Sequence, residues 1–324
     1  MAPEEIFGLV KAKLDAVSAR FSESLGSNVD VVSAMGGYIS GGGGKRLRPA
    51  LMLICSGLVQ YEGTDDILFG SVFELIHTAT LVHDDIIDEA ATRRGRESVN
   101  RRWGNPLTVL MGDHLYIKAM QQAISGGDLR ILDLLAETTL GMIEGEMIQR
   151  DQNGRIDVDE QGHLEVVKRK TALLFSACCR TPAMLAGAPE RTQIALQSYG
   201  LDLGMAYQLV DDLLDFTGSE ERLGKPTLND LREGKLTLPL IYLLQEGNPR
   251  HAEMILTVIE DRGFDRVPRE EILSLLHSRG CLARGRATAV RYAERARRHL
   301  SGFADGPYLN ALVSVLDLVL ERDR

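Results

Sequence analysis

Two segments of the chain carry aspartates at the same DDxxD spacing. Residues 73–95 read FELIHTATLVHDDIIDEAATRRG, and residues 204–218 read GMAYQLVDDLLDFTG. The aspartates are Asp84, Asp85, Asp88, Asp211, Asp212 and Asp215. On a helix, residues four apart share a face, so Asp84 and Asp88 would repel one another unless a cation lay between them. Mg²⁺ prefers oxygen ligands and binds through one or two carboxylates together with substrate phosphates. The spacing therefore predicts a site for metal ions and a diphosphate.

A single DDxxD is about as often a solvated helix face as a metal site. Here each motif is surrounded by Leu, Ile and Val, where an uncompensated group of carboxylates would be costly. The repetition of the motif in one chain favours metal binding over a solvated face.

Basic residues occur near glycines and near the first aspartate segment, where we expect the helix to end close to Gly95. Arginine offers a planar fork to phosphate oxygens, and lysine offers a compact charge. Any one of these cations alone is more commonly a surface residue. The candidate phosphate ligands are Lys45, Arg48, Arg93, Arg94, Lys170, Lys225 and Lys235.

The elements that position these residues are predicted to be helices. Apolar residues recur at helical spacing over most of the length, as in Ile6, Val10, Leu14 and Val17. Aromatic residues make up only 5%, and runs of β-branched residues are short. No low-complexity linker divides the 324 residues. We expect a nearly all-α fold with a single domain over 1–324.

Composition and charge exclude several classes of protein. The formal net charge of −9 argues against sequence-independent binding to nucleic acid, which requires a basic surface. No apolar run is long enough to span a membrane, and the N-terminus lacks the pattern of a secretory signal. Four cysteines without a CxxC pair indicate reduced thiols, so we expect a cytoplasmic protein.

In the order and spacing of its motifs, the chain resembles the trans-isoprenyl diphosphate synthases, also called polyprenyl synthetases. The motifs that carry the resemblance are GKRLRP at 44–49, the first aspartate segment, MGDHL at 111–115, KT at 170–171, YQLVDDLLD at 207–215 and GKP at 224–226. The resemblance implies one large helical bundle of the isoprenoid synthase type around a deep central cavity. It also implies that the two aspartate-rich helices face each other across that cavity.

The resemblance further implies the reaction and its metal. Mg²⁺, as three ions with substrate bound and with Mn²⁺ as an alternative, would bridge the aspartates to an allylic diphosphate. Asp84, Asp88 and Asp211 are the main ligands that it implies, and Asp85, Asp212 and Asp215 support them or share a metal. Ionisation would release diphosphate and give an allylic carbocation that the double bond of isopentenyl diphosphate attacks. The adduct would then lose a proton, for which the released diphosphate is the family's usual candidate base.

By the same resemblance, the isopentenyl diphosphate site comprises Lys45, Arg48, His77 and Arg94. The allylic diphosphate site comprises Arg93, Lys170, Lys225 and Lys235, while Thr171 and Gln208 line the allylic chain near its reacting end. Lys170 and Gln208 join Asp84, Asp88 and Asp211 as the residues expected to act in catalysis. Without the resemblance, His77 would be read as an ordinary core histidine.

Product length follows from the residues before the first motif, where bulky side chains close the cavity in this family. The positions four and five before Asp84 hold Thr80 and Ala79, which are small. Ile76 and Phe73 lie eight and eleven residues before Asp84, which is about two and three helical turns. We therefore expect a long product of about C40, which the resemblance connects to quinone side chains.

One position departs from the family's GKPxGxDL pattern, because Leu228 stands where glycine is usual. This leaves the path of the surrounding loop, and so the role of Lys225, open. A homodimer and transient membrane contact by a lipid-soluble product are also implied. Two rival readings are a class I terpene cyclase, whose second motif is normally of Asn/Ser/Glu type, and a regulatory subunit, which tends to lose motif aspartates.

Overall fold

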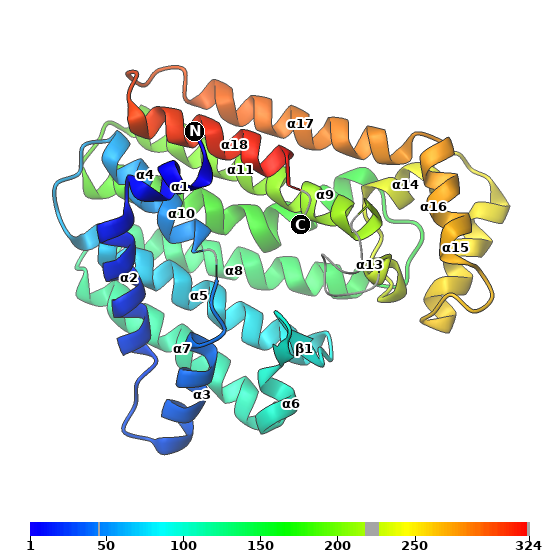
Figure 1. The fold of residues 1–324 in the computed structure, drawn as a ribbon, viewed down its shortest axis with the longest axis horizontal. Helices are drawn as coiled ribbons and strands as arrows, with labels where there is room; N and C mark the ends of the chain where they lie inside the picture. The colour runs from blue at the N-terminus through cyan, green and yellow to red at the C-terminus, as the bar shows by residue number, and fades with distance from the viewer. Residues whose placement is uncertain (45, 218–226, 323–324) are drawn as a thin grey trace. The chain divides into compact units, whose positions relative to one another are not determined.

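The computed structural model describes residues 1–44, 46–217 and 227–322, and helices account for most of them (Figure 1). Within these ranges the strands are β1 (Thr92–Arg93) and β2 (Arg96–Glu97), which form one antiparallel hairpin. The prediction of an all-α fold is confirmed. The hairpin is an addition to it that the sequence pattern did not reveal.

The first seven α-helices of the described chain include α5 (Asp65–Ile87), which carries the first aspartate motif, and the helices on either side of it in the sequence. They are α1 (Pro3–Gly8), α2 (Lys11–Ser24), α3 (Asp30–Ser40), α4 (Leu47–Leu58), α5 (Asp65–Ile87), α6 (Val99–Trp103) and α7 (Asn105–Ser125). The helices that follow are α8 (Leu129–Gln152), α9 (Glu160–Val167), the π-helix η1 (Lys168–Ala172), α10 (Leu173–Leu185), α11 (Glu190–Thr217), α13 (Asn229–Arg232), α14 (Leu238–Leu244), α15 (Pro249–Asp261), α16 (Arg269–Ser278), α17 (Cys281–His299) and α18 (Pro307–Leu320).

The described chain divides into two compact units. Unit 1 comprises 1–139, 177–197 and 303–314, and unit 2 comprises 140–176, 198–302 and 315–324 without its undescribed residues. Helices α8, α10, α11 and α18 contribute residues to both units. The first aspartate motif belongs to unit 1 and the second to unit 2. A single domain over the whole chain remains a prediction.

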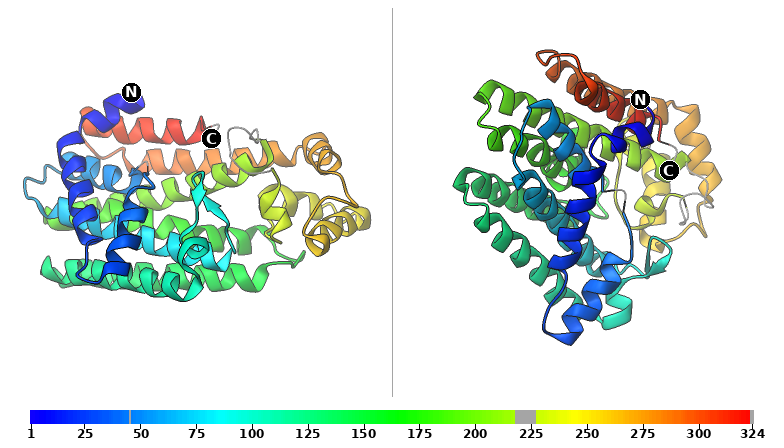
Figure 2. Two further views of the ribbon diagram at one scale, coloured as in Figure 1. Left: turned by 60° about the horizontal axis from the view of Figure 1, so that its bottom comes forward. Right: turned by 60° about the vertical axis from the view of Figure 1, so that its left-hand side comes forward.

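Helix α5 is the central helix of unit 1. Its residues 68–76 are all buried, as expected for a helix that is apolar on nearly every side. It packs against α2, α4 and α7, and α5 and α7 run side by side in both figures (Figure 1, Figure 2). The first aspartate motif therefore lies at the end of a helix that packs against three others in this unit.

In unit 2, the apolar side of α14 is buried against α17, and all residues of 238–243 are buried.

Local sequence signals explain where several helices begin. Asp159 caps α9 by accepting a bond from the backbone N–H of Gly162 at 2.7 Å, and Pro239 and Pro249 stand in the first turns of α14 and α15.

Close approach of helices in unit 2 depends on glycine. A Cβ atom at Gly145 of α8 would lie 2.6 Å from the Cβ atom of Arg169 and 2.9 Å from the backbone N of Lys170. Only glycine allows α8 to approach η1 this closely.

Two further findings bear on the sequence expectations. All four cysteines are buried free thiols. Among the described residues, no helix has both the length and the apolar character required to cross a membrane.

Candidate functional site

The first aspartate motif lies at the C-terminal end of α5. Asp84 and Asp85 are in the last turn, and Asp88 caps the helix with φ −89° and ψ 3°. The expectation that this helix continues to near Gly95 was wrong. Glu89 adopts the left-handed φ of 51°, the N–H of Glu89 donates to Ile86, and the N–H of Ala90 donates to the carbonyl of Asp85. This is a Schellman cap, which stops the helix at Ile87.

Arg93 and Arg94 lie on the hairpin that follows. Arg93 pairs with Arg96 across the ladder, so the loop consists of Arg94 and Gly95. Both loop residues have positive φ, 53° and 73°, which is the geometry of a type I′ turn. Asn-Gly or Asp-Gly is usual there, and an arginine in the left-handed region is strained.

The hairpin returns its two arginines to the end of α5 and to the glycine run. The Nε of Arg93 donates to Asp85 Oδ1 at 2.6 Å, and the guanidinium of Arg94 donates to the carbonyl of Gly43. The Asp85 carboxyl is almost fully buried. Burial raises the pKa of Asp85, and the charge of Arg93 opposes that rise.

A pocket in unit 1 gathers several of the predicted phosphate ligands. His77, Asp85, Arg93 and Arg94 line it, together with Arg46. Burial lowers the pKa of His77 well below its usual range, and the positive charges of Arg48, Arg94, Arg93 and Arg46 lower it further. The imidazole is therefore neutral near pH 7, in surroundings that favour an anion. Lys45 lies outside the described residues.

The four residues predicted to control product length all lie on α5. Phe73, Ile76 and Ala79 are fully buried, whereas Thr80 is half-buried. Thr80, which is one helical turn from Asp84, shares its face of α5. The hydroxyl of Thr80 donates to the carbonyl of His77 at 2.8 Å.

The second aspartate motif lies near the end of α11 in unit 2. Asp211 is exposed, with Oδ1 3.5 Å from the guanidinium of Arg322. Asp212 is buried, and its Oδ1 accepts from the side-chain amide of Gln208 at 2.9 Å. Gln208 accepts in turn from the hydroxyl of Thr171 at 2.9 Å. Thr171, Gln208 and Asp212 thus form one connected chain of hydrogen bonds.

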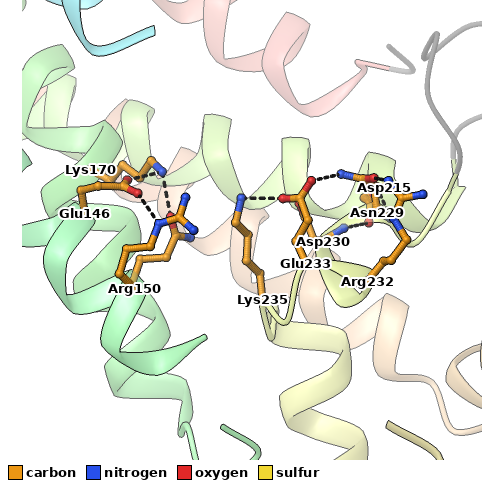
Figure 3. Close-up of polar contacts among 10 residues, drawn as sticks. Glu146, Arg150, Lys170, Asp215, Asn229, Asp230, Arg232, Glu233 and Lys235 are labelled. Atoms are coloured by element: carbon orange, nitrogen blue, oxygen red, sulfur yellow. Dashed lines mark hydrogen bonds and ion pairs between the residues drawn. The ribbon is translucent and has the colours of Figure 1, made fainter. Parts of the chain in front are cut away.

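Asp215, the last aspartate of the motif, binds the backbone of the neighbouring segment. Its two carboxylate oxygens accept from the N–H groups of Asn229 and Asp230, each at 3.1 Å (Figure 3). Its carbonyl accepts from the N–H of Leu228 at 2.8 Å. Asp215 therefore joins the end of α11 to the start of α13.

Leu228 shows why glycine is the residue expected at this position. Its φ of 58° and ψ of 29° lie in the left-handed region, at the residue before α13. The side chain is fully buried. The chain keeps a turn that glycine would form without strain. The burial of the leucine side chain offsets the conformational cost of the left-handed backbone.

Lys170 and Lys235 line a second pocket, in unit 2, with Thr171, Gln208 and Asp212. Lys170 lies in the π-helix η1, a distortion that is frequent at functional sites. Its ammonium donates to Gln149 Oε1 at 2.7 Å and forms an ion pair with Glu146 (Figure 3). Lys235 pairs with Glu233 at 2.8 Å. Lys225 lies outside the described residues.

Residues that the sequence analysis missed also belong to these pockets. His163 is buried, and its Nε2 lies 3.2 Å from Asp212 Oδ2. Glu146 and Gln149 hold Lys170. Arg46 forms a part-buried pair with Glu74 at 2.5 Å in the unit 1 pocket. No spacing pattern connects these residues, because their partners lie on other helices.

The aspartates differ in their capacity to bind a metal. Within the described ranges, no group of three or more His, Cys, Asp or Glu side chains is close enough to hold an ion. Asp85, Asp212 and Asp215 are engaged by donors of the protein itself. Asp84, Asp88 and Asp211 present carboxylates that are half-buried or exposed. That donor set fits a hard cation that takes one or two carboxylates and completes its shell with substrate phosphates.

Comparison with known proteins gives a consistent result. Residues 29–275 match the family model for polyprenyl synthetase. The chain is 38% identical over 321 residues to octaprenyl diphosphate synthase of Escherichia coli (strain K12), covering 99% of each chain.

Solved structures agree with the sequence comparison. A polyprenyl synthase from Caulobacter crescentus CB15, solved with calcium and isoprenyl diphosphate, matches with a TM-score of 0.94 at 31% identity, over 100% of this chain and 98% of the other. A decaprenyl diphosphate synthase from Rhodobacter capsulatus matches with a TM-score of 0.93 at 34% identity, over 99% of both chains.

The helical fold, the paired aspartate motifs and the basic pockets define a metal-dependent transferase that acts on diphosphates. The chain belongs to the polyprenyl synthetase family. It is a prenyltransferase that catalyses trans-prenyl chain elongation.

Proposed function

We propose that this protein is a long-chain synthase that condenses isopentenyl diphosphate repeatedly with an allylic diphosphate to give an all-trans product of about C40. The observation that carries the proposal is the pair of small residues, Ala79 and Thr80, just before the first aspartate motif on α5. The similarity to an octaprenyl diphosphate synthase over the full length supports the same chain length. Quinone side chains are the proposed use of the product.

For isopentenyl diphosphate we propose the basic pocket of unit 1, with His77 and Arg94, together with Arg48, whose charge acts on His77 without lining the pocket, and with Lys45 from outside the described residues. The pocket's arginines support binding of an anion, and the low pKa of His77 keeps that side chain a neutral hydrogen-bond partner. For the allylic diphosphate we propose Arg93, Lys170, Lys235 and Lys225. The allylic chain would contact Thr171 and Gln208 near its reacting end.

The proposed metal ligands are Asp84, Asp88 and Asp211, and the proposed metal is Mg²⁺, as three ions with substrate bound, or Mn²⁺. Bound metal would supply charge stabilisation for the departing diphosphate. Asp85, Asp212 and Asp215 would orient the ends of α5 and α11, which agrees with their bonds to Arg93, Gln208 and backbone amides.

The protein's own residues would carry out the remaining tasks. Arg93 and Lys170 would hold the allylic diphosphate and stabilise its growing negative charge as the bond to carbon breaks. Arg94 and His77 would hold isopentenyl diphosphate so that its double bond points at the cation that forms. Gln208, held by Thr171 and Asp212, would be fixed beside the reacting end of the chain.

We also propose a homodimer that works in the cytoplasm and touches membranes only transiently, to release product. Support for the dimer comes from α7, where Leu110, Ile117 and Ile124 recur every seven residues and are each more than 60% exposed. An apolar stripe of this kind on a helix commonly marks an interface. Sedimentation of the purified protein would test the oligomeric state.

Product analysis tests the proposed function. Purified protein is incubated with isopentenyl diphosphate, farnesyl diphosphate and Mg²⁺, and the products are separated by reversed-phase chromatography after dephosphorylation. We expect a main product of about C40. A product that stops at C20 would refute the chain length, and hydrocarbons released without isopentenyl diphosphate would indicate a cyclase.

A further inference from the structure

An aromatic and arginine cluster lies next to the hairpin of unit 1. It consists of Tyr38 on α3, Arg96 on β2, and Arg102 and Trp103 on α6, and we refer to these four residues as the hairpin clamp. The left view of Figure 2 shows the hairpin, in cyan, beside α6. None of the four residues is among the proposed metal or substrate ligands, although Tyr38 and Arg96 line the same pocket as Arg93 and Arg94.

Tyr38 is the centre of the clamp because it contacts every other member. Its ring lies 4.1 Å from the guanidinium of Arg96 and 4.6 Å from that of Arg102. Trp103 packs edge-on against it, with ring centroids 5.1 Å apart and an interplanar angle of 71°. Guanidinium groups over aromatic faces and edge-to-face rings are both favourable contacts.

Hydrogen bonds add direction to these contacts. The hydroxyl of Tyr38 donates to the carbonyl of Glu97 at 2.7 Å, and Arg96 donates to the carbonyl of Tyr38 at 3.4 Å. At the base of the hairpin, directly after β2, the hydroxyl of Ser98 donates to the carbonyl of Ala90 at 2.5 Å. Strand β2 is thus bonded to α3, and the residue after it is bonded to the segment that precedes β1.

The hairpin needs such support, because each strand has only two residues and an isolated two-stranded hairpin is marginal in water. Its turn is also strained, since Arg94 has φ 53° where asparagine or glycine is preferred. Arg93 and Arg94 are nevertheless directed to fixed partners, Asp85 and the carbonyl of Gly43. The clamp supports β2, together with the bond of Ser98 at the base of the hairpin.

We propose that the hairpin clamp positions Arg93 and Arg94 for diphosphate binding, with Tyr38 as its central positioning residue. The inference rests on the proposed function, which gives the two arginines their substrate. If the clamp were surface packing without this role, its loss would leave substrate binding unchanged.

The test combines trypsin sensitivity with steady-state kinetics on the full-length protein. Trypsin cleaves after arginine, so the rate of cleavage after Arg93, Arg94 and Arg96 reports directly on opening of the hairpin. For Tyr38→Leu we expect this rate to rise about tenfold and the KM for isopentenyl diphosphate to rise about tenfold, equal to about 1.4 kcal/mol each. Tyr38→Phe keeps the ring and loses only the bond to Glu97, so we expect a smaller change in both.

Matched controls distinguish the effect of losing a clamp contact from the effects of losing a charge and of destabilising the whole protein. Arg102→Ala removes a clamp residue, and Arg101→Ala removes the same charge from an exposed neighbour outside the clamp. We expect only the first to change cleavage and KM. The urea midpoint of unfolding, measured for every variant, shows whether the whole protein has been destabilised.

The outcomes distinguish failure of the clamp from failure of the proposed site. Unchanged cleavage and unchanged KM in Tyr38→Leu and Arg102→Ala would overturn the proposal. Arg94→Ala serves as the reference for the site: if it leaves KM unchanged, the substrate role of Arg94 is wrong, and a positioning role toward that substrate falls with it. Raised cleavage with raised KM, at an unchanged urea midpoint, would support the clamp as the positioning element.

Discussion

Product length should respond to a single side chain on the exposed side of α5. Thr80 lies one turn before Asp84 and is half-buried, whereas Ala79 is fully buried. A bulky residue at Thr80 can therefore project along the face that carries Asp84 without displacing the core. We expect Thr80→Phe to shorten the product while the enzyme stays folded and active.

The size of the effect follows from helix geometry. At a rise of 1.5 Å per residue, Thr80 lies about 6 Å along α5 from Asp84, and Phe73 lies about 16 Å from it. A wild-type chain that passes Thr80 and extends at least as far as Phe73 would therefore lose at least about 10 Å of path to a stop at Thr80. Each isoprene unit extends a chain by about 5 Å, since carbon–carbon bonds are about 1.5 Å long. The variant's main product should be at least two isoprene units shorter.

The assay uses radiolabelled isopentenyl diphosphate with farnesyl diphosphate, followed by chromatography of the dephosphorylated products. Thr80→Val is the matched control, because it removes the hydroxyl without adding bulk and should leave the product unchanged. Ala79→Tyr is a harsher test, since overpacking a buried position costs about 1–3 kcal/mol. A Thr80→Phe enzyme that turns over normally and still makes the wild-type product would refute a path along this face.

Three further predictions concern the turn, the second motif and His77. Arg94→Asn should raise the free energy of unfolding by about 1 kcal/mol, because asparagine tolerates positive φ. The same change should raise the KM for isopentenyl diphosphate at least about tenfold, because charged hydrogen bonds are worth about 1.5–3 kcal/mol; an unchanged KM would contradict it. Asp215→Ala should lower the free energy of unfolding by about 2 kcal/mol in urea, by orphaning backbone amides. Asp211→Ala should change the free energy of unfolding little but lower activity strongly. A larger stability loss in Asp211→Ala than in Asp215→Ala, with activity retained, would contradict Asp211 as a metal ligand. The pKa of His77 is lower in the folded chain than in the unfolded chain, where it is about 6.5. The contribution of neutral His77 to stability is therefore complete above about pH 6.5, and it is lost as the pH falls toward the pKa of the folded state. Urea titrations across this window should show a drop that His77→Asn reduces, and an identical drop in the variant would count against the prediction.

Much of the fold was predictable because helical spacing is a long-range, repeated signal. The helical state of α5, its apolar surroundings and the position of Asp84 on it follow from the pattern of residues 73–88, whereas its end at Ile87 does not. The pairing of like motifs identified the metal ligands proposed for α5 and α11. Family resemblance supplied the proposed substrate residues, since neither Arg93 nor Lys170 belongs to a periodic pattern.

What the sequence did not reveal depends on single residues in unusual backbone states. Glu89 ends α5 in a left-handed conformation that glycine normally adopts, so the stop carried no recognisable signal. Arg94-Gly95 forms a tight turn without the usual asparagine. The π-helical turn at Lys170 and its contacts with Glu146 depend on packing between helices, which local pattern does not encode.

The bonds made by Asp85, Asp212 and Asp215 have a consequence for how the protein persists between catalytic cycles. Half of the motif carboxylates are satisfied by an arginine, an amide side chain or backbone N–H groups of the chain itself. The ends of α5 and α11 therefore retain their shape when no ion neutralises them. We therefore expect folding not to depend on bound metal, unlike in zinc fingers, whose chains unfold without it. Protein treated with a chelator should stay folded and regain its activity when metal is restored.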